Sequence, residues 1–114
     1  MTADEKTLLN LLGYVFLRSG RPDKAAVVLT ALDVLAPGEL RALRALAMAH
    51  LKSDKPQKAL DTLDRLAMAG GVDAAFHLLR AQALTKLVRL DEATAAMKSY
   101  VRLRRAAVIT PTGT

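Results

Sequence analysis

The chain has no cysteine and no tryptophan, and it has only two tyrosines and two phenylalanines among its 114 residues. Without cysteine it can form neither a disulfide nor a thiolate metal site. So few aromatic rings leave little for stacking nucleic-acid bases, and the sequence shows no recognisable DNA- or RNA-binding motif. It also lacks an apolar run near the roughly 18 residues that span a membrane. We therefore expect no nucleic-acid partner and no direct membrane insertion.

Charge is distributed unevenly along the chain. The net charge is +6, with −2 on residues 1–5 and +5 on residues 74–114. A basic end attracts nucleic acid, an anionic membrane surface or an acidic protein partner. Since the aromatic residues that nucleic-acid binding requires are scarce, most of this charge is interpreted as a solvated helix face.

What the chain does have is alanine and leucine at a regular interval. Apolar residues make up 52% of it, and few are β-branched or aromatic, which favours helices over strands. The strings GRPDKA, DKPQKA and VRLDEA follow one another at intervals of 34 residues. Small residues recur at the same interval, namely Gly13, Ala47 and Ala81, then Ala25, Ala59 and Ala93. Such a period is typical of stacked helix–turn–helix units.

Six helices are expected from this pattern, at 4–18, 22–35, 39–52, 56–68, 73–87 and 91–104. Pro22 suits the first turn of a helix, and Gly20 suits a helix end with positive φ. Gly13 and its equivalents should lie where the two helices of a pair approach most closely, while Leu29 fills the space between pairs. Residues 106–114 are expected to be a flexible tail.

The 34-residue spacing resembles the tetratricopeptide repeat. The first unit carries the resemblance at Leu9, Leu12, Gly13, Phe16, Gly20, Pro22, Ala25, Leu29, Leu32 and Pro37. Later units depart from the pattern at His50, Asp54, His77, Arg80 and Val88. The resemblance implies an all-α fold, a short right-handed solenoid of three tetratricopeptide repeats. They would occupy about 6–39, 40–73 and 74–105 of one domain spanning 1–105.

The register of such repeats implies a groove on the concave side, lined by the first helix of each pair. A groove with apolar centres and basic edges can seat an amphipathic helix or an extended peptide. The alternative is that these residues are an ordinary surface of a stacking module, or are covered by the chain's own ends. The predicted groove comprises Asn10, Tyr14, Leu17, Arg18, Arg41, Arg44, Met48, Leu51, Lys52, Leu78, Gln82 and Thr85.

One variant of the repeat clamps a C-terminal carboxylate with Lys, Asn and Arg at set groove positions. The corresponding places in this chain hold Asn10, Tyr14, Ala45, Ala75 and Leu79. That pattern is absent, so a receptor for chaperone tails is not expected.

Catalysis has no support in the sequence. His50 and His77 lie far apart and have no neighbouring nucleophile or ligand set, so they are interpreted as structural. Asp61 and Arg65 are interpreted as a surface pair one helical turn apart. We predict no catalytic residue, no metal site and no cofactor.

The last helix should leave part of an apolar face without a neighbouring unit, at Met97, Tyr100 and Val101. Large apolar patches are rarely left open. We therefore expect a partner chain or a second copy to cover this face, unless Arg102, Arg104 and Arg105 mask it.

Among tetratricopeptide repeat proteins, the chain resembles the SctY-type chaperones of bacterial type III secretion. Residues 8–51 carry this resemblance through a Gly-aromatic start, a Gly turn and an arginine-rich third helix, and residues 78–103 resemble the last repeat. It implies a non-enzymatic chaperone in the bacterial cytoplasm, peripheral at the inner-membrane export apparatus. The chaperone would bind a small secreted SctX-type protein as a heterodimer and deliver it to the export-gate protein SctV. A homodimer is the alternative for the free chain. Class II chaperones of translocator proteins and a generic repeat scaffold are the alternative functions.

Overall fold

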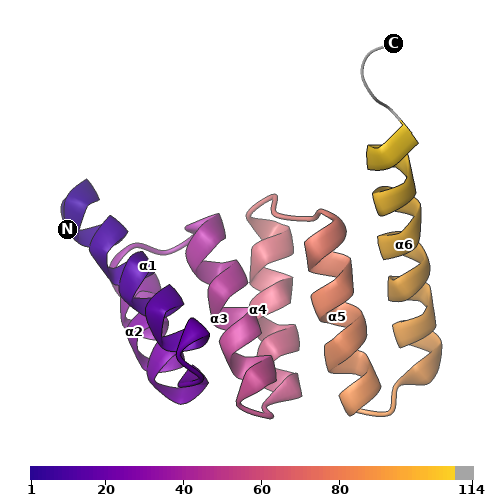
Figure 1. The fold of residues 1–114 in the computed structure, drawn as a ribbon, viewed down its shortest axis with the longest axis horizontal. Coiled ribbons are helices and arrows are strands. Elements are labelled where there is room, and N and C mark those ends of the chain that lie inside the picture. The colour runs from indigo at the N-terminus through magenta and orange to yellow at the C-terminus, as the bar shows by residue number, and fades with distance from the viewer. Residues whose placement is uncertain (110–114) are drawn as a thin grey trace.

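The computed structural model describes residues 1–109, which form six α-helices in three antiparallel pairs (Figure 1). Each helix contacts the next along the chain, and α3 also contacts α1 and α5. The first helices of the pairs therefore form one layer, and the second helices form the other. The helices are α1 (Ala3–Arg18), α2 (Pro22–Leu35), α3 (Leu40–Lys52), α4 (Pro56–Met68), α5 (Ala74–Lys86) and α6 (Leu90–Ile109).

The all-α repeat prediction is confirmed, and five of the six helices begin and end within one residue of the expected bounds. The exception is α6, which continues to Ile109, so the expected tail is wrong for residues 106–109. Alanine is the strongest helix former, and the first residue that stops the helix pattern is Pro111. Residues 110–114 of the expected tail lie outside the described residues. Within 1–109, every helix is too short or too polar to cross a bilayer.

All three pairs turn through the same backbone motif. After α1, the N–H groups of Gly20 and Arg21 donate to carbonyls of the last helical turn, in the two-bond Schellman arrangement. The same two bonds recur after α3 and after α5. The residue that must adopt positive φ is Gly20 (74°) in the first turn, Asp54 (59°) in the second and Val88 (59°) in the third. The turn thus keeps its geometry even where glycine is missing.

We expect Val88→Gly to raise the free energy of unfolding. A left-handed conformation costs a β-branched residue roughly 1–2 kcal/mol, and glycine removes this cost. Against it, the greater entropy of glycine in the unfolded chain lowers the free energy of unfolding by up to about 1 kcal/mol. The expected net gain is about 1 kcal/mol, measured by urea unfolding. The matched control is Gly20→Val, because an added Cβ there meets nothing within 4 Å. That variant should lose stability; if neither substitution changed it, strain in the turn would be ruled out.

Gly13 lies where α1 and α2 approach each other closely. A Cβ added to it would lie 2.7 Å from Cδ2 and 2.8 Å from Cγ of Leu29, a fully buried side chain. This confirms that the glycine marks a close approach inside the pair. The expectation that Leu29 serves to fill space between pairs was incomplete, because it contacts Gly13 within its own pair. The helix therefore carries a glycine that costs roughly 1 kcal/mol relative to alanine so that Leu29 can be buried.

Substitution Gly13→Val should lower the free energy of unfolding by about 2 kcal/mol, since overpacking a filled core forces its neighbours out of place. In a chain that already carries Leu29→Ala, Gly13→Val should lower the free energy of unfolding much less, because the leucine side chain that it would meet is absent. Thermal and urea unfolding of the four proteins in this cycle provide the measurement. Additive losses would mean that the two residues do not constrain each other.

Two hydrophobic clusters form the core, and α3 belongs to both. One face of α3 packs with residues of the first pair, including Leu29 and Leu32. The other face packs with residues of α4, α5 and α6. The residues of α3 that face the first pair are Ala42, Ala45, Leu46 and Ala49. Those that face the later helices are Leu43, Ala47 and Leu51.

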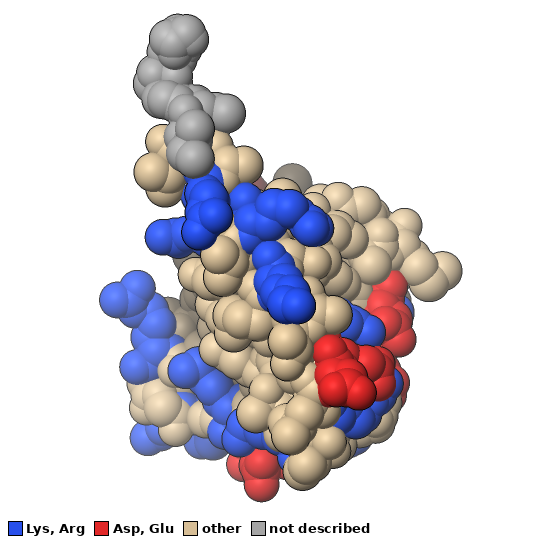
Figure 2. Space-filling model, turned by 90° about the vertical axis from the view of Figure 1, so that its right-hand side faces the viewer, with Lys and Arg blue, Asp and Glu red and all other residues tan. Residues whose placement is uncertain are grey.

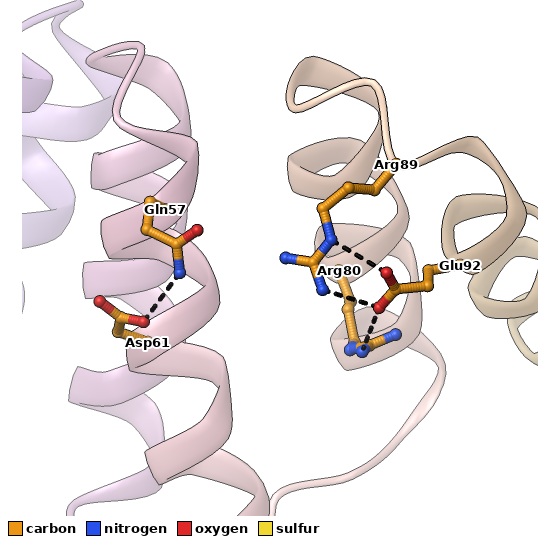
Figure 3. Close-up of polar contacts among 5 residues, drawn as sticks. All are labelled: Gln57, Asp61, Arg80, Arg89 and Glu92. Atoms are coloured by element: carbon orange, nitrogen blue, oxygen red, sulfur yellow. Dashed lines mark hydrogen bonds and ion pairs between the residues drawn. The ribbon is translucent and has the colours of Figure 1, made fainter.

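Ion pairs connect consecutive units of the stack. Arg65 of α4 donates two hydrogen bonds to Asp33 of α2, one of them at 2.9 Å, and Asp33 is only 9% exposed. This replaces the expected surface pair of Arg65 with Asp61, whose carboxylate instead accepts a 3.1 Å bond from Gln57 (Figure 3). Because truncating Arg65 would leave a buried carboxylate unpaired, the contact fixes α4 against α2.

In the third pair, an ion-pair cluster forms at Glu92 of α6. Its carboxylate accepts hydrogen bonds of 2.9 and 2.8 Å from Arg89, which hold the pKa of Glu92 below its ordinary range. Arg80 of α5 approaches the same carboxylate at 3.8 Å (Figure 3). Arg80 is a departure from the repeat pattern, and its ion pair with α6 gives that departure a structural role.

Candidate partner-binding groove

Two hollows of about 350 Å³ lie along the face formed by α1, α3 and α5. The first lies between α1 and α3, and its lining includes Lys6, Asn10, Tyr14, Glu39 and Arg41. The second lies between α3 and α5. It is lined by Met48, Leu51, Lys52, Leu79, Gln82 and Lys86. These two hollows together are called the groove below.

The structure brings seven of the twelve predicted groove residues to these hollows. They are Asn10, Tyr14 and Arg41 in the first, and Met48, Leu51, Lys52 and Gln82 in the second. Their contact with a partner stays a prediction. Of the other lining residues, Ala3, Lys6, Leu11 and Glu39 were not indicated by the sequence, and Leu79 was considered only as a clamp position.

Leu17 was placed in the groove, and the structure instead places it in the core at 8% exposure. Leu17 lies four residues after Gly13 and belongs to the same cluster as Leu29, the residue that Gly13 meets, whereas Tyr14 is only partly buried against that cluster. Leu51 lies one period after Leu17. It lines the second hollow but is only 7% exposed, so little of its side chain is open to a partner.

The remaining four predicted residues line neither hollow: Arg18, Arg44, Leu78 and Thr85. Arg44 donates a 2.8 Å hydrogen bond to Asp73, which also accepts from the backbone N–H of Phe76 at 2.9 Å and so caps α5. This arginine therefore joins α3 to the start of α5. Thr85 turns its hydroxyl back to the carbonyl of Ala81 at 2.8 Å.

Positive charge dominates the rim of the groove. Lys6 is paired with Glu39 at 3.3 Å and Lys86 with Asp54 at 3.4 Å. Within residues 1–109, Arg41 and Lys52 have no ion-pair partner, and both are exposed. Unpaired cations beside an apolar floor suit a segment that carries apolar side chains and acidic neighbours.

Asn10 supplies a polar group inside the first hollow. Its amide nitrogen donates to the carbonyl of Lys6 at 3.3 Å, while its Oδ1 is buried and has no hydrogen-bond partner among the described residues. A buried acceptor without a partner costs stability.

The two histidines have perturbed pKa values with structural causes. Burial lowers the pKa of His50 below its ordinary value of 6.5, and the nearby charges of Lys58 and Lys55 lower it further. Burial also lowers the pKa of His77, whose ring meets the ring of Phe76 edge-on at 5.2 Å. In the part of the chain described, no cluster of three or more His, Asp or Glu side chains is placed to hold a metal ion.

We expect acid to destabilise the protein partly through His50. Its pKa is lower in the folded chain than in the unfolded one, so the unfolded chain binds the proton more readily. Stability present above pH 6.5 should therefore be lost as the pH falls below that value. Urea unfolding across this range should show a shallower loss for His50→Gln than for the unchanged chain. An identical slope in the two proteins would assign the acid sensitivity to other groups.

Comparison with known proteins agrees with this architecture. A sequence model of the tetratricopeptide repeat matches residues 16–83, so the chain belongs to the tetratricopeptide repeat family. Such repeats are protein-interaction scaffolds that are generally not enzymes.

Among solved structures, the fold is similar to that of the second tetratricopeptide repeat domain of Spaghetti (RPAP3) bound to the HSP90 peptide SRMEEVD. The TM-score is 0.79 at 21% identity, covering 86% of this chain and 91% of that one. A likeness at this identity establishes the fold. No curated protein matches the sequence.

Proposed function

We propose that the chain is a binding module that holds an amphipathic or extended segment of a partner protein in the groove. The family supports protein binding in general. The observation that supports the groove in particular is the apolar floor of the second hollow, formed by Met48, Leu51 and Leu79 beside the unpaired Lys52. The apolar side chains of a bound segment would cover this floor, and its acidic side chains would neutralise the charge of Lys52.

The narrower proposal is an SctY-type chaperone of type III secretion. Its partner would be a small secreted SctX-type protein, which it would stabilise in the bacterial cytoplasm and deliver to SctV. Support comes from the resemblance of residues 8–51 and 78–103, together with three repeats and no cysteine. The comparisons favour a generic interaction scaffold more directly, so that function and a class II translocator chaperone are the competing outcomes.

The similar repeat domain of Spaghetti is bound to the peptide SRMEEVD. For this chain, clamping of a terminal carboxylate is not the proposed mode of binding. The places that correspond to clamp residues hold neutral side chains, and two of them are buried, Ala45 at 0% and Leu79 at 7% exposure. Recognition is therefore assigned to side chains along the partner segment rather than to its terminus.

The experiment that tests the narrower proposal is co-expression with the product of a neighbouring gene for a small secreted protein. A stable complex on size exclusion, with a partner that degrades when expressed alone, is the expected result. A chain that ignores this protein would overturn the chaperone proposal and leave the generic scaffold.

The groove itself is tested by Lys52→Glu, which places an acidic residue beside the second hollow. We expect the affinity for the partner segment to fall about tenfold, with the difference shrinking at high salt. Lys24→Glu on α2 is the matched control, because it makes the same charge change on an exposed helix of the other layer. Isothermal titration calorimetry measures both. Equal losses would show that net charge alone attracts the partner, which would contradict binding in the groove.

A further inference from the structure

The outer face of α1 carries a stripe of exposed apolar side chains. They are spaced by three and four residues, so they lie on one side of the helix. The stripe consists of Leu8 (64%), Leu11 (56%), Leu12 (38%) and Val15 (55%).

The equivalent positions in the next repeat show how such a stripe is normally packed. One period later, the same positions on α3 hold Ala42, Ala45, Leu46 and Ala49, all at most 4% exposed. Those residues pack against the preceding pair in the cluster that contains Leu29 and Leu32. The stripe of α1 is therefore a stacking face of the same kind, and within residues 1–109 no preceding pair covers it.

The charges at the two ends of the stripe are opposite and unpaired. Asp4 precedes it and Arg18 follows it, on the same side of α1. Neither has an ion-pair partner within the described residues, and the nearby Glu5 is engaged in capping the helix through Thr2. Asp4 and Arg18 are about 21 Å apart along the helix, so they cannot pair with each other.

We propose that α1 of a second copy of this chain covers the stripe, antiparallel, in a two-fold symmetric dimer. An antiparallel pair places Asp4 of each copy opposite Arg18 of the other and puts Leu11 near the two-fold axis. The stripe thus matches itself in apolar character and in the charges at its ends, as an isologous interface requires. The dimer goes beyond the proposed function. Of the stripe only Leu11 lines the groove, in its first hollow, and no stripe residue lines the second hollow between α3 and α5, which carries the proposed function.

The opposite end of the stack does not suit a second copy. A hollow of about 760 Å³ beside α6 is lined by Met97 and Val101, but also by Lys98, Arg102 and Arg105. Figure 2 shows Lys and Arg side chains gathered on this end of the molecule. Bringing two such faces together would oppose like charges, which is costly.

Light scattering after size exclusion tests the dimer on the full chain. The expected mass is twice 12.3 kDa. Leu8→Glu and Val15→Glu should each give a monomer with unchanged helicity, because both side chains are exposed in the single chain. Met68→Glu, 89% exposed on α4, is the matched control and should remain dimeric.

Charge exchange and cross-linking then test the antiparallel arrangement. Asp4→Arg and Arg18→Asp should each raise the dissociation constant about tenfold, and the double exchange should restore it. Since the chain has no cysteine, Leu11→Cys should form an interchain disulfide under oxidising conditions, whereas Met68→Cys should not.

Three outcomes would overturn the proposal. The first is a monomer at every concentration. The second is a dimer broken by Met97→Glu but not by Leu8→Glu. The third is a monomeric chain whose complex with a co-expressed partner is lost on Leu8→Glu, which would assign the stripe to that partner. None of these results depends on Lys52, so failure of the dimer and failure of the groove are distinguishable.

Discussion

The close approach of Gly13 to Leu29 is the constraint on which the rest of the structure depends. A helix pair can bury a large leucine at its crossing only if the facing position carries almost no side chain. The same position is Ala47 in the second pair and Ala81 in the third, both at most 1% exposed. A small residue at this position in each unit allows the three pairs to close in the same way, and pairs of similar shape can stack. The groove exists because the stacked first helices leave hollows between them.

The helices could be predicted from the sequence because their signals are local and repeated. Pro22, Gly20 and the 34-residue interval each limit where a helix begins or ends, and an error in one unit is corrected by the others. The end of α6 was predicted too early because the repeat pattern places it at residue 104, whereas the helix-forming Ala106 and Ala107 allow the helix to continue to Ile109. Val88 is a case in which the local preference of a residue does not predict its conformation. It occupies a turn that its own preferences oppose, because the backbone hydrogen bonds of the turn outweigh them.

The groove was less predictable because it depends on side-chain direction and on contacts between units. Leu17 and Tyr14 are three residues apart, yet Leu17 is buried in the core, whereas Tyr14 is only partly buried against it and also lines a hollow. Arg44 was expected to meet a partner, and it bonds instead to Asp73, a residue 29 positions away. Neither the repeat period nor local propensity reveals which opposite charges will meet across units. The apolar stripe of α1 has the same origin, since only comparison with the buried face of α3 shows that its exposure is unusual.

The place of α3 in both hydrophobic clusters has a consequence for how the chain opens. A helix that contributes to two cores cannot unfold without disrupting both, whereas α6 contacts α5 but no other helix strongly. In a stack where each unit depends on its neighbours, local opening begins at the ends and stops at the helix with the most partners. Amide protons of α3 should therefore exchange only when the whole domain opens, and those of α6 should exchange during smaller fluctuations. Local stability is thus highest at the centre of the stack and lowest at the end that carries most of the positive charge.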